Sequence, residues 1–243
     1  DSAIIKVDQV RQLQHSLSLA PYEARYRVAL LCNFQLANAN AQNALLKTLE
    51  EAPRQVILLL TADSAENVLP TIASRCEILR LRPLSIETLQ SELVRRWQFS
   101  PTNARLYAHL SGGRPGLALR LAEDGQQQEQ RTHWLDEFVR LFHLNIRERF
   151  TYSESINRSR DTLRSELQIW LSYSRDLFLV ISQSDAPLTN IDRQDELFEL
   201  AKRFDASSSL ATIQALQSSL EALEVNANLR LLTDTLMLSL PRL

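Results

Sequence analysis

The chain has 243 residues, enough for two domains of ordinary size or one large domain with a substantial core. Its 27 lysines and arginines nearly balance its 29 aspartates and glutamates, so the strongly basic composition typical of non-specific DNA binding is missing, and any nucleic-acid contact must be local or shared with partners. No apolar stretch approaches the roughly 18 residues that a membrane-spanning helix needs, so we expect no membrane contact.

The cysteines and glycines narrow the possible functions. Cys32 and Cys76 are too few for a disulfide framework or a four-cysteine zinc site, and they fit a protein of the reducing cytoplasm. All four glycines lie between Gly112 and Gly125, so neither glycine-rich phosphate-binding motif, GxxxxGKS/T or GxGxxG, occurs and we expect no complete nucleotide site. Asp1 opens the chain without a methionine or a signal-peptide pattern, which favours a fragment of a longer protein.

The first 83 residues alternate the signals of strands and helices. Three apolar runs have the length and composition of strands: residues 28–31, 56–60 and 77–81. The first two are unbroken, as in strands buried on both faces. Helix-forming stretches precede and separate these runs: Val10–Leu17, Asn40–Glu51 and one turn at Pro70. Strands separated by helices predict a mainly parallel sheet of the α/β class.

From residue 85 onward the strand signals stop. Ser85 and the Ser100–Pro101 pair are favourable helix starts, and the glycine-rich turn at residues 112–116 precedes a third short helix. Long stretches with helical periodicity follow, near residues 131–150, 158–183, 193–204, 208–224 and 226–240. The predicted fold class is α/β plus all-α: an incomplete α/β domain in residues 1–83, a three-helix domain in 84–125 and a helical bundle in 126–243.

Two segments carry a family resemblance. They are RVALLCNFQLANANAQNALLKTLEEAP, residues 27–53, and VILLLTADSAENVLPTIASRCEILRLRPLS, residues 56–85. These segments resemble the AAA+ ATPase domain of the clamp-loader subunits of bacterial DNA polymerase III, in particular the delta prime type. Residues 41–53 and 69–76 match two separated motifs of that family in order and spacing, and residues 225–241 resemble the end of delta prime subunits. In the family, a first strand, a Walker A loop and a four-cysteine zinc module come before the part that matches here.

The resemblance implies a task within an assembly. It implies a subunit that does not itself hydrolyse ATP, supplies an arginine finger in trans and helps to load the sliding clamp on primed DNA during replication. The implied partners are gamma/tau-type and delta-type loader subunits, the clamp and, through the complex, primed DNA. We expect no cofactor in this chain, since neighbouring subunits would bind ATP and Mg²⁺ and zinc would belong to the missing N-terminal part. The three-helix domain would be a lid, and the bundle a collar for oligomerisation.

The positions that would bind magnesium depart from the family pattern. In an active ATPase of this class the Walker B strand ends in Asp-Glu, and the matching residues here are Cys32 and Asn33. A thiol and an amide are poor substitutes, because Mg²⁺ prefers anionic oxygen ligands. Cys32 also fits a structural role as a small buried apolar residue at a strand end. The departure argues against hydrolysis, and therefore against one rival interpretation, a gamma/tau-type ATPase subunit of the same loader.

The motif Ser74-Arg75-Cys76 matches the family's arginine finger, which contacts ATP bound to the neighbouring subunit. A planar guanidinium can pair with two γ-phosphate oxygens and neutralise the charge that develops there. The alternative is a structural arginine that tethers the short helix to an acidic surface such as Glu77. A second rival function, a helical scaffold with a relic ATPase fold, would be favoured if Arg75 proved dispensable for clamp loading.

Two sensor positions complete the expected site. Thr61 follows the second strand, where the family places sensor 1, a polar side chain that contacts the γ-phosphate. A threonine that ends a strand and begins a turn is at least as good an interpretation. Sensor 2, an arginine in active relatives, corresponds to Gly116. Arg114 lies two residues earlier and is either a substitute or a solvent-exposed turn arginine, and we prefer the second.

Overall fold

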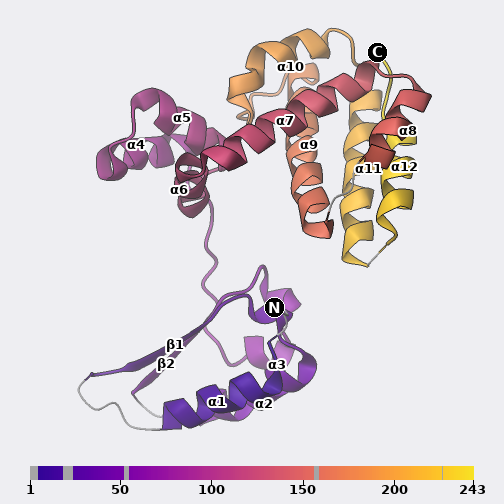
Figure 1. Ribbon diagram of the computed structural model, residues 1–243. Coiled ribbons are helices and arrows are strands. Elements are labelled where there is room, and N and C mark those ends of the chain that lie inside the picture. Colours follow the sequence, from indigo (N-terminus) through magenta and orange to yellow (C-terminus); the bar gives the residue numbers. More distant parts are fainter. Residues whose placement is uncertain (1–4, 19–23, 52–54, 156–158, 226) are drawn as a thin grey trace. The chain divides into compact units, whose positions relative to one another are not determined.

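Figure 1 shows the computed structural model of the chain, which describes residues 5–18, 24–51, 55–155, 159–225 and 227–243. The chain divides into two compact units, one ending at Leu81 and one beginning at Arg82. Most elements are helices, and β1 and β2 form a small parallel sheet. No helix in these ranges is long and apolar enough to cross a membrane. The finer division into domains of residues 1–83, 84–125 and 126–243 stays a prediction.

The first unit is built around two strands of five residues each. Its elements are α1 (Val7–Ser18), β1 (Arg27–Leu31), the 3-10 turn η1 (Phe34–Leu36), α2 (Ala39–Glu50), β2 (Val56–Leu60), the 3-10 turn η2 (Ala65–Asn67) and α3 (Pro70–Ala73). The strands run parallel and in register, from Arg27 opposite Val56 to Leu31 opposite Leu60. The parallel pairing predicted from the sequence is confirmed for these two strands.

One face of the strand pair packs against helices, and the other is exposed. Leu31 and Leu58 pack on a buried cluster that includes Leu45 of α2 and residues of α1 and α3. On the opposite face, Val28 is 58% and Leu30 59% exposed. The expectation of burial on both faces is therefore wrong within the described residues, because α1 and α2 contact each other and share a single core.

Polar side chains fix helix α2 within this unit. Asn38 caps its first turn by accepting a backbone hydrogen bond. The buried Gln42 donates to the Ala37 carbonyl at 3.0 Å and accepts from the Leu69 N–H at 2.8 Å, which ties α2 to the segment before α3. Gln14 of α1 donates to a backbone carbonyl and to a threonine hydroxyl of α2, both at 2.7 Å. Helix α2 is thus anchored on two sides.

Residues 77–81 form no strand, so the third strand predicted from the sequence is wrong. Leu79 and Leu81 are largely exposed to solvent. A strand is stable only where a neighbour supplies hydrogen bonds, and in the described part of the chain the sheet contains β1 and β2 alone. The segment therefore has the apolar composition of a strand, but among the described residues no neighbouring strand pairs with it.

The second unit is helical. It contains α4 (Ile86–Trp97), α5 (Pro101–Leu110), α6 (Pro115–Glu123), α7 (Gly125–His143), α8 (Ile146–Ser155), α9 (Arg160–Ile181), the 3-10 turn η3 (Ile191–Arg193), α10 (Gln194–Ala201), α11 (Ala206–Glu224) and α12 (Leu229–Ser239). The predicted starts at Ser85 and Ser100 are confirmed, because each hydroxyl oxygen accepts from the N–H three residues ahead at 3.2 Å.

The helical stretch predicted near residues 131–150 is divided between two helices, because the chain turns between α7 and α8. Asn145 and Glu148 form a capping box at this turn. The Asn145 side chain accepts from the Glu148 N–H at 3.0 Å, and the Glu148 carboxylate accepts from the Asn145 N–H at 2.9 Å. These two bonds satisfy backbone donors that the start of α8 would otherwise leave free.

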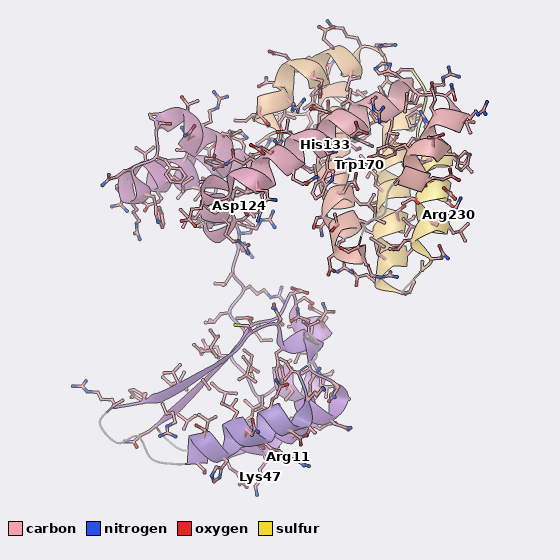
Figure 2. All side chains as sticks on the ribbon, in the orientation of Figure 1. Arg11, Lys47, Asp124, His133, Trp170 and Arg230 are labelled. Carbon is pink, nitrogen blue, oxygen red and sulfur yellow. The ribbon has the colours of Figure 1, made fainter. Side chains whose placement is uncertain are left out.

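Aromatic side chains fill the core of the bundle formed by α7–α12. Trp170 of α9 lies inside the bundle (Figure 2) and stacks on Phe138 of α7 with ring centroids 4.8 Å apart. Phe142 packs edge to face on Phe138 at 4.8 Å and on Phe204 at 5.0 Å. The rings of Trp170, Phe138 and Phe142 are almost fully buried. These contacts join helices that are far apart in the sequence into one core.

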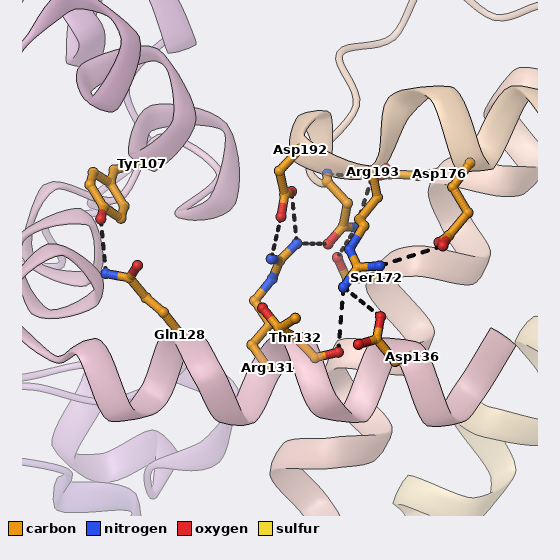
Figure 3. Close-up of polar contacts among 11 residues, drawn as sticks. Tyr107, Gln128, Arg131, Thr132, Asp136, Ser172, Asp176, Asp192 and Arg193 are labelled. Atoms are coloured by element: carbon orange, nitrogen blue, oxygen red, sulfur yellow. Dashed lines mark hydrogen bonds and ion pairs between the residues drawn. The ribbon is translucent and has the colours of Figure 1, made fainter. Parts of the chain in front are cut away.

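The three-helix part, α4–α6, meets the bundle without a linker. A single residue, Asp124, separates α6 from α7 and caps α7 (Figure 2). Gln128 of α7 donates to the Tyr107 hydroxyl of α5 at 2.8 Å, and Arg131 of α7 pairs with Asp192 at 2.6 Å (Figure 3). Helix α7 therefore contacts the three-helix part near its start and the bundle further along.

A buried arginine on α8 joins the ends of two other helices. Arg149 donates to four backbone carbonyls at distances from 2.5 to 3.2 Å: Leu141, Met237, Leu240 and Pro241. These carbonyls lie at the C-terminal ends of α7 and α12, where a helix leaves carbonyls unpaired and a cation is favourable. Burial lowers the pKa of the Arg149 guanidinium, and the charge of Arg242 acts in the same direction.

We predict that Arg149→Ala lowers the free energy of unfolding of the bundle by about 3 kcal/mol, because it leaves buried carbonyls without donors. The matched control is Arg147→Ala on the exposed side of the same helix, for which we expect a change below about 0.5 kcal/mol. Urea unfolding followed by tryptophan fluorescence measures both variants. Equal stabilities would show that the Arg149 contacts do not stabilise the bundle.

Candidate functional site

Parallel pairing brings the ends of β1 and β2 to one edge of the sheet. Leu31 and Leu60 lie opposite each other, so the residues that follow them meet. The Thr61 N–H donates to the Leu31 carbonyl at 3.0 Å, and the Phe34 N–H donates to the Thr61 carbonyl at 2.8 Å. The structure therefore places Thr61 beside the turn that contains residues 32–33, and these three sequence-predicted positions lie together.

Asn33 and Thr61 are joined by a direct hydrogen bond. Asn33 has a left-handed backbone conformation with φ 54° and ψ 48°, which asparagine tolerates better than most residues. Its N–H donates to the Thr61 hydroxyl oxygen at 3.0 Å. The Thr61 side chain therefore stabilises the turn after β1, which is the structural role expected of a threonine at a strand end.

The side chains at this edge do not fit magnesium. Cys32 is exposed, so its interpretation as a buried apolar residue is wrong. Neither its thiol nor the Asn33 amide is an anionic oxygen ligand of the kind that Mg²⁺ prefers. One carboxylate lies nearby: Asp63 accepts a hydrogen bond at 3.0 Å from the side-chain amide of Gln35 in η1. Across the described ranges, no three His, Cys, Asp or Glu side chains are grouped as a metal site.

Arg75 lies at the other end of α2. The segment that contains it runs along this helix, with Leu69 bonded to Gln42 near the start of α2 and Arg75 bonded to Glu50 at its last residue. The Arg75 Nε donates to Glu50 Oε1 at 2.8 Å, and Nη2 lies 2.6 Å from the same oxygen. The acidic partner is thus Glu50, and the alternative that named Glu77 was wrong about the contact.

Backbone and hydroxyl groups around α3 hold the other side of the Arg75 guanidinium. Its Nη1 donates to the Thr71 carbonyl at 3.0 Å and approaches the Ser74 hydroxyl oxygen at 3.4 Å. Ser74 itself donates to the Thr71 carbonyl at 3.2 Å. The Arg75 side chain is 38% exposed despite these contacts. It is therefore contacted on two sides while part of it faces solvent.

The two positions linked to sensor 2 lie in the second unit. Gly116 is in the first turn of α6, and a Cβ atom there would meet nothing within 4 Å, so the position has room for a larger side chain. Arg114 precedes this helix and donates from Nε to the Ser111 carbonyl at 2.8 Å. Arg114 therefore completes its own turn, in agreement with the interpretation we preferred.

Two contributors to this region were missed in the sequence. Glu50 looked like part of an ordinary polar helix end, because its partner is 25 positions away in the sequence. Gln42 is buried and bonded at both ends of its amide, which no periodicity argument indicates. The usable signal for Glu50 was its position: an acidic residue in the last turn of a helix is electrostatically unfavourable unless a cation compensates.

Comparison with known proteins shows what the chain resembles. Residues 1–85 match the family model described as DNA polymerase III, delta subunit. The crystal structure of a DNA polymerase III gamma subunit-related protein from Thermotoga maritima has a TM-score of 0.50 and 19% sequence identity, and the match covers 98% of this chain and 80% of that chain. The structural likeness shows a shared, largely helical fold with a small parallel sheet.

The curated relatives that resemble part of this chain are subunits of DNA polymerase III. The DNA polymerase III delta′ subunit of Bacillus subtilis is 30% identical over 131 residues, which cover 54% of this chain and 39% of the relative. The delta′ subunit of Pseudomonas aeruginosa is 38% identical over 129 residues, which cover 52% of this chain and 39% of the relative. The tau subunit of Escherichia coli is 35% identical over 88 residues, which cover 36% of this chain and 14% of the relative. The matches span about two fifths of the delta′ relatives' length. Over the matched residues the chain is therefore similar to delta′ and tau subunits of DNA polymerase III.

We predict that the two cysteines differ in reactivity by at least about tenfold, because alkylation requires an accessible thiolate. Cys32 is exposed, whereas burial raises the pKa of the Cys76 thiol, which packs on the core of the first unit. Titration with a thiol reagent at mildly alkaline pH should show one fast and one slow phase. Cys32→Ser should remove the fast phase and Cys76→Ser the slow one, and a single phase in the unsubstituted protein would contradict this exposure pattern.

Proposed function

We propose that this chain is a delta prime-type subunit of the DNA polymerase III clamp loader that does not hydrolyse ATP itself. It supplies Arg75 in trans to nucleotide bound by a neighbouring subunit. In that role it helps to load the sliding clamp on primed DNA in the bacterial cytoplasm. The proposal rests on a class that the comparisons support and on the geometry of the first unit.

The position of Arg75 carries the proposal. Residues 32–33 occupy the sheet edge next to the start of α2, and Arg75 is bonded to the last residue of the same helix. A helix of 12 residues is about 18 Å long, so this guanidinium is too far away to serve a nucleotide at the chain's own Walker B position. An exposed arginine at the far end of α2 is suited to a nucleotide held by another chain.

The chemistry of the guanidinium fits this role. Phosphoryl transfer develops charge on the γ-phosphate oxygens, and an arginine from a neighbouring chain can pair with two of them at once. The ATP and Mg²⁺ in this scheme belong to the neighbouring subunit. The strand edge of this chain offers Cys32 and Asn33 in place of the two carboxylates, so it lacks groups to hold Mg²⁺ and to orient an attacking water.

Assembly with gamma/tau-type and delta-type subunits would use the helical bundle as a collar. Leu232, Leu236 and Leu240 of the last helical segment are buried in the bundle's own core. Leu231 and Leu238 of α12 are instead 68% and 59% exposed, seven residues apart and so on the same side of the helix. This apolar stripe supports α12 as a contact surface for the partner subunits.

The alternative function with a specific observation behind it is a gamma/tau-type ATPase subunit. The tau relative is 35% identical over its matched part, comparable to the delta′ relatives. Cys32 and Asn33 weigh against this alternative, and the matches to the delta′ relatives are longer. A relic ATPase fold that serves only as a scaffold is the remaining alternative, and it requires that Arg75 has no effect on the loader.

We predict that the purified full-length subunit has no ATPase activity of its own, because two carboxylates needed for hydrolysis are missing. Steady-state phosphate release should stay at the background of the buffer. Thr61→Ala distinguishes intrinsic activity from contamination, since Thr61 is bonded to the turn at the Walker B position. Turnover above background that disappears in this variant would contradict the proposal and favour the gamma/tau-type alternative.

We predict that Arg75→Ala leaves folding and assembly intact but slows ATP hydrolysis by the loader. Loss of an arginine finger costs roughly 10³-fold or more at the site it serves. The effect on the whole complex will be smaller, because other sites keep their own fingers. Folding should be preserved, because the exposed ion pair between Arg75 and Glu50 contributes at most about 1 kcal/mol to stability.

The control for this experiment is Arg82→Ala, which removes an exposed arginine seven residues further along the chain. Turnover is measured with assembled loader, sliding clamp and primed DNA. If Arg75→Ala and Arg82→Ala both hydrolyse ATP and load clamps at the unsubstituted rate, the finger assignment is wrong and the scaffold alternative is favoured.

A further inference from the structure

The Glu50–Arg75 pair is unusual for a surface ion pair in how much of the guanidinium it engages. One carboxylate oxygen, Glu50 Oε1, accepts from both Nε and Nη2 at 2.8 and 2.6 Å. The Thr71 carbonyl takes an N–H of Nη1 at 3.0 Å. An arginine has five N–H donors in a fixed plane, so contacts on two sides determine the orientation of that plane.

Glu50 makes its contact from a firmly anchored helix. Helix α2 is capped by Asn38, tied to α1 through Gln14 and tied to the segment before α3 through Gln42. Leu45, five residues before Glu50 on the same helix, is fully buried. The carboxylate is therefore presented by a rigid element, while Arg75 lies just beyond a helix of only four residues. The longer helix holds the side chain of the shorter segment.

The location of Glu50 indicates that the pair has a purpose besides helix stability. A negative charge in the last turn of a helix interacts unfavourably with the helix dipole. The neighbouring cation offsets this cost. Both side chains remain partly exposed, at 38% for Arg75 and 49% for Glu50, so the pair does not fill a core.

We infer that Glu50 is a positioning residue for Arg75, an inference that rests on the proposed finger function. Glu50 keeps the guanidinium in one conformation before the neighbouring nucleotide arrives. Among the described contacts, the second N–H of Nη2 is engaged by neither Glu50 nor Thr71, and this end of the fork is available for a phosphate oxygen. Less side-chain freedom is then lost on binding, since an unrestrained arginine has many rotamers to give up.

The test compares Glu50→Gln with the matched control Glu51→Gln in the assembled loader. Glu51 is the next residue, is exposed and has the same side chain. We expect Glu50→Gln to lower the maximal rate of ATP hydrolysis roughly three- to tenfold with little change in the ATP concentration for half-maximal rate, because a finger acts mainly in the transition state. Glu51→Gln should match the unsubstituted loader.

A double-substitution cycle separates positioning from a structural role. If Glu50 acts through Arg75, adding Glu50→Gln to Arg75→Ala should cause no further loss of rate. A similar loss in both backgrounds, an unchanged rate for Glu50→Gln, or a faster rate would each overturn the inference. A faster rate would mean that Glu50 competes with phosphate for the guanidinium.

A measurement on the chain alone separates this inference from the proposed function. Hydrogen exchange of the Arg75 Nε–H, observed by NMR, should be slower in the unsubstituted protein than in Glu50→Gln, because the carboxylate accepts that proton. Equal exchange rates would overturn the positioning role whatever the ATPase data show. If Glu50→Gln speeds the exchange of the Arg75 Nε–H as expected but Arg75→Ala leaves the ATPase rate of the loader unchanged, the finger function fails instead.

Discussion

Parallel pairing of β1 and β2 is the constraint from which the geometry of the first unit follows. Two parallel strands cannot be joined by a tight turn, so the chain has to cross over through α2 before β2 can begin. This crossover separates two regions by the length of one helix. Asn33 meets Thr61 where both strands end, and Arg75 meets Glu50 where α2 ends. The Cys32–Asn33 turn and the Arg75 guanidinium thereby lie at different places in one small unit, as the proposed action in trans requires.

In the second unit the corresponding constraint is the cost of burying helix ends. The bundle brings the C-terminal ends of α7 and α12 together, and Arg149 provides donors to both. Arg160 does the same for α11 by donating to the Leu223 and Ala227 carbonyls at 2.8 and 3.1 Å. Each arginine satisfies carbonyls that would otherwise be desolvated without a donor. The aromatic core around Trp170 supplies burial, and these arginines allow the helix ends to lie close to it.

Local signals predicted most elements, and features that depend on distant partners were missed. Strands β1 and β2 and the caps at Ser85 and Ser100 follow from a few neighbouring residues, and the structure has them where expected. The Asn145–Glu148 box that splits α7 from α8 was not predicted, although an Asn and a Glu three positions apart are a local signal of such a box. Exposure of one sheet face, the unpaired segment 77–81 and the pairing of Arg75 with Glu50 depend on which elements meet in space. No pattern within one element specifies those contacts.

The central claim, that Arg75 serves a nucleotide bound by another chain, is tested most directly by the structure of an assembled loader. Electron cryo-microscopy of the full-length subunit with its partner subunits and an ATP transition-state analogue would show the interface. We expect an Arg75 guanidinium nitrogen within about 3 Å of the γ-phosphate analogue held by the neighbour, with Glu50 still beside it. A well-resolved complex in which Arg75 contacts only its own chain, at an interface whose nucleotide is stabilised by other residues, would contradict the account.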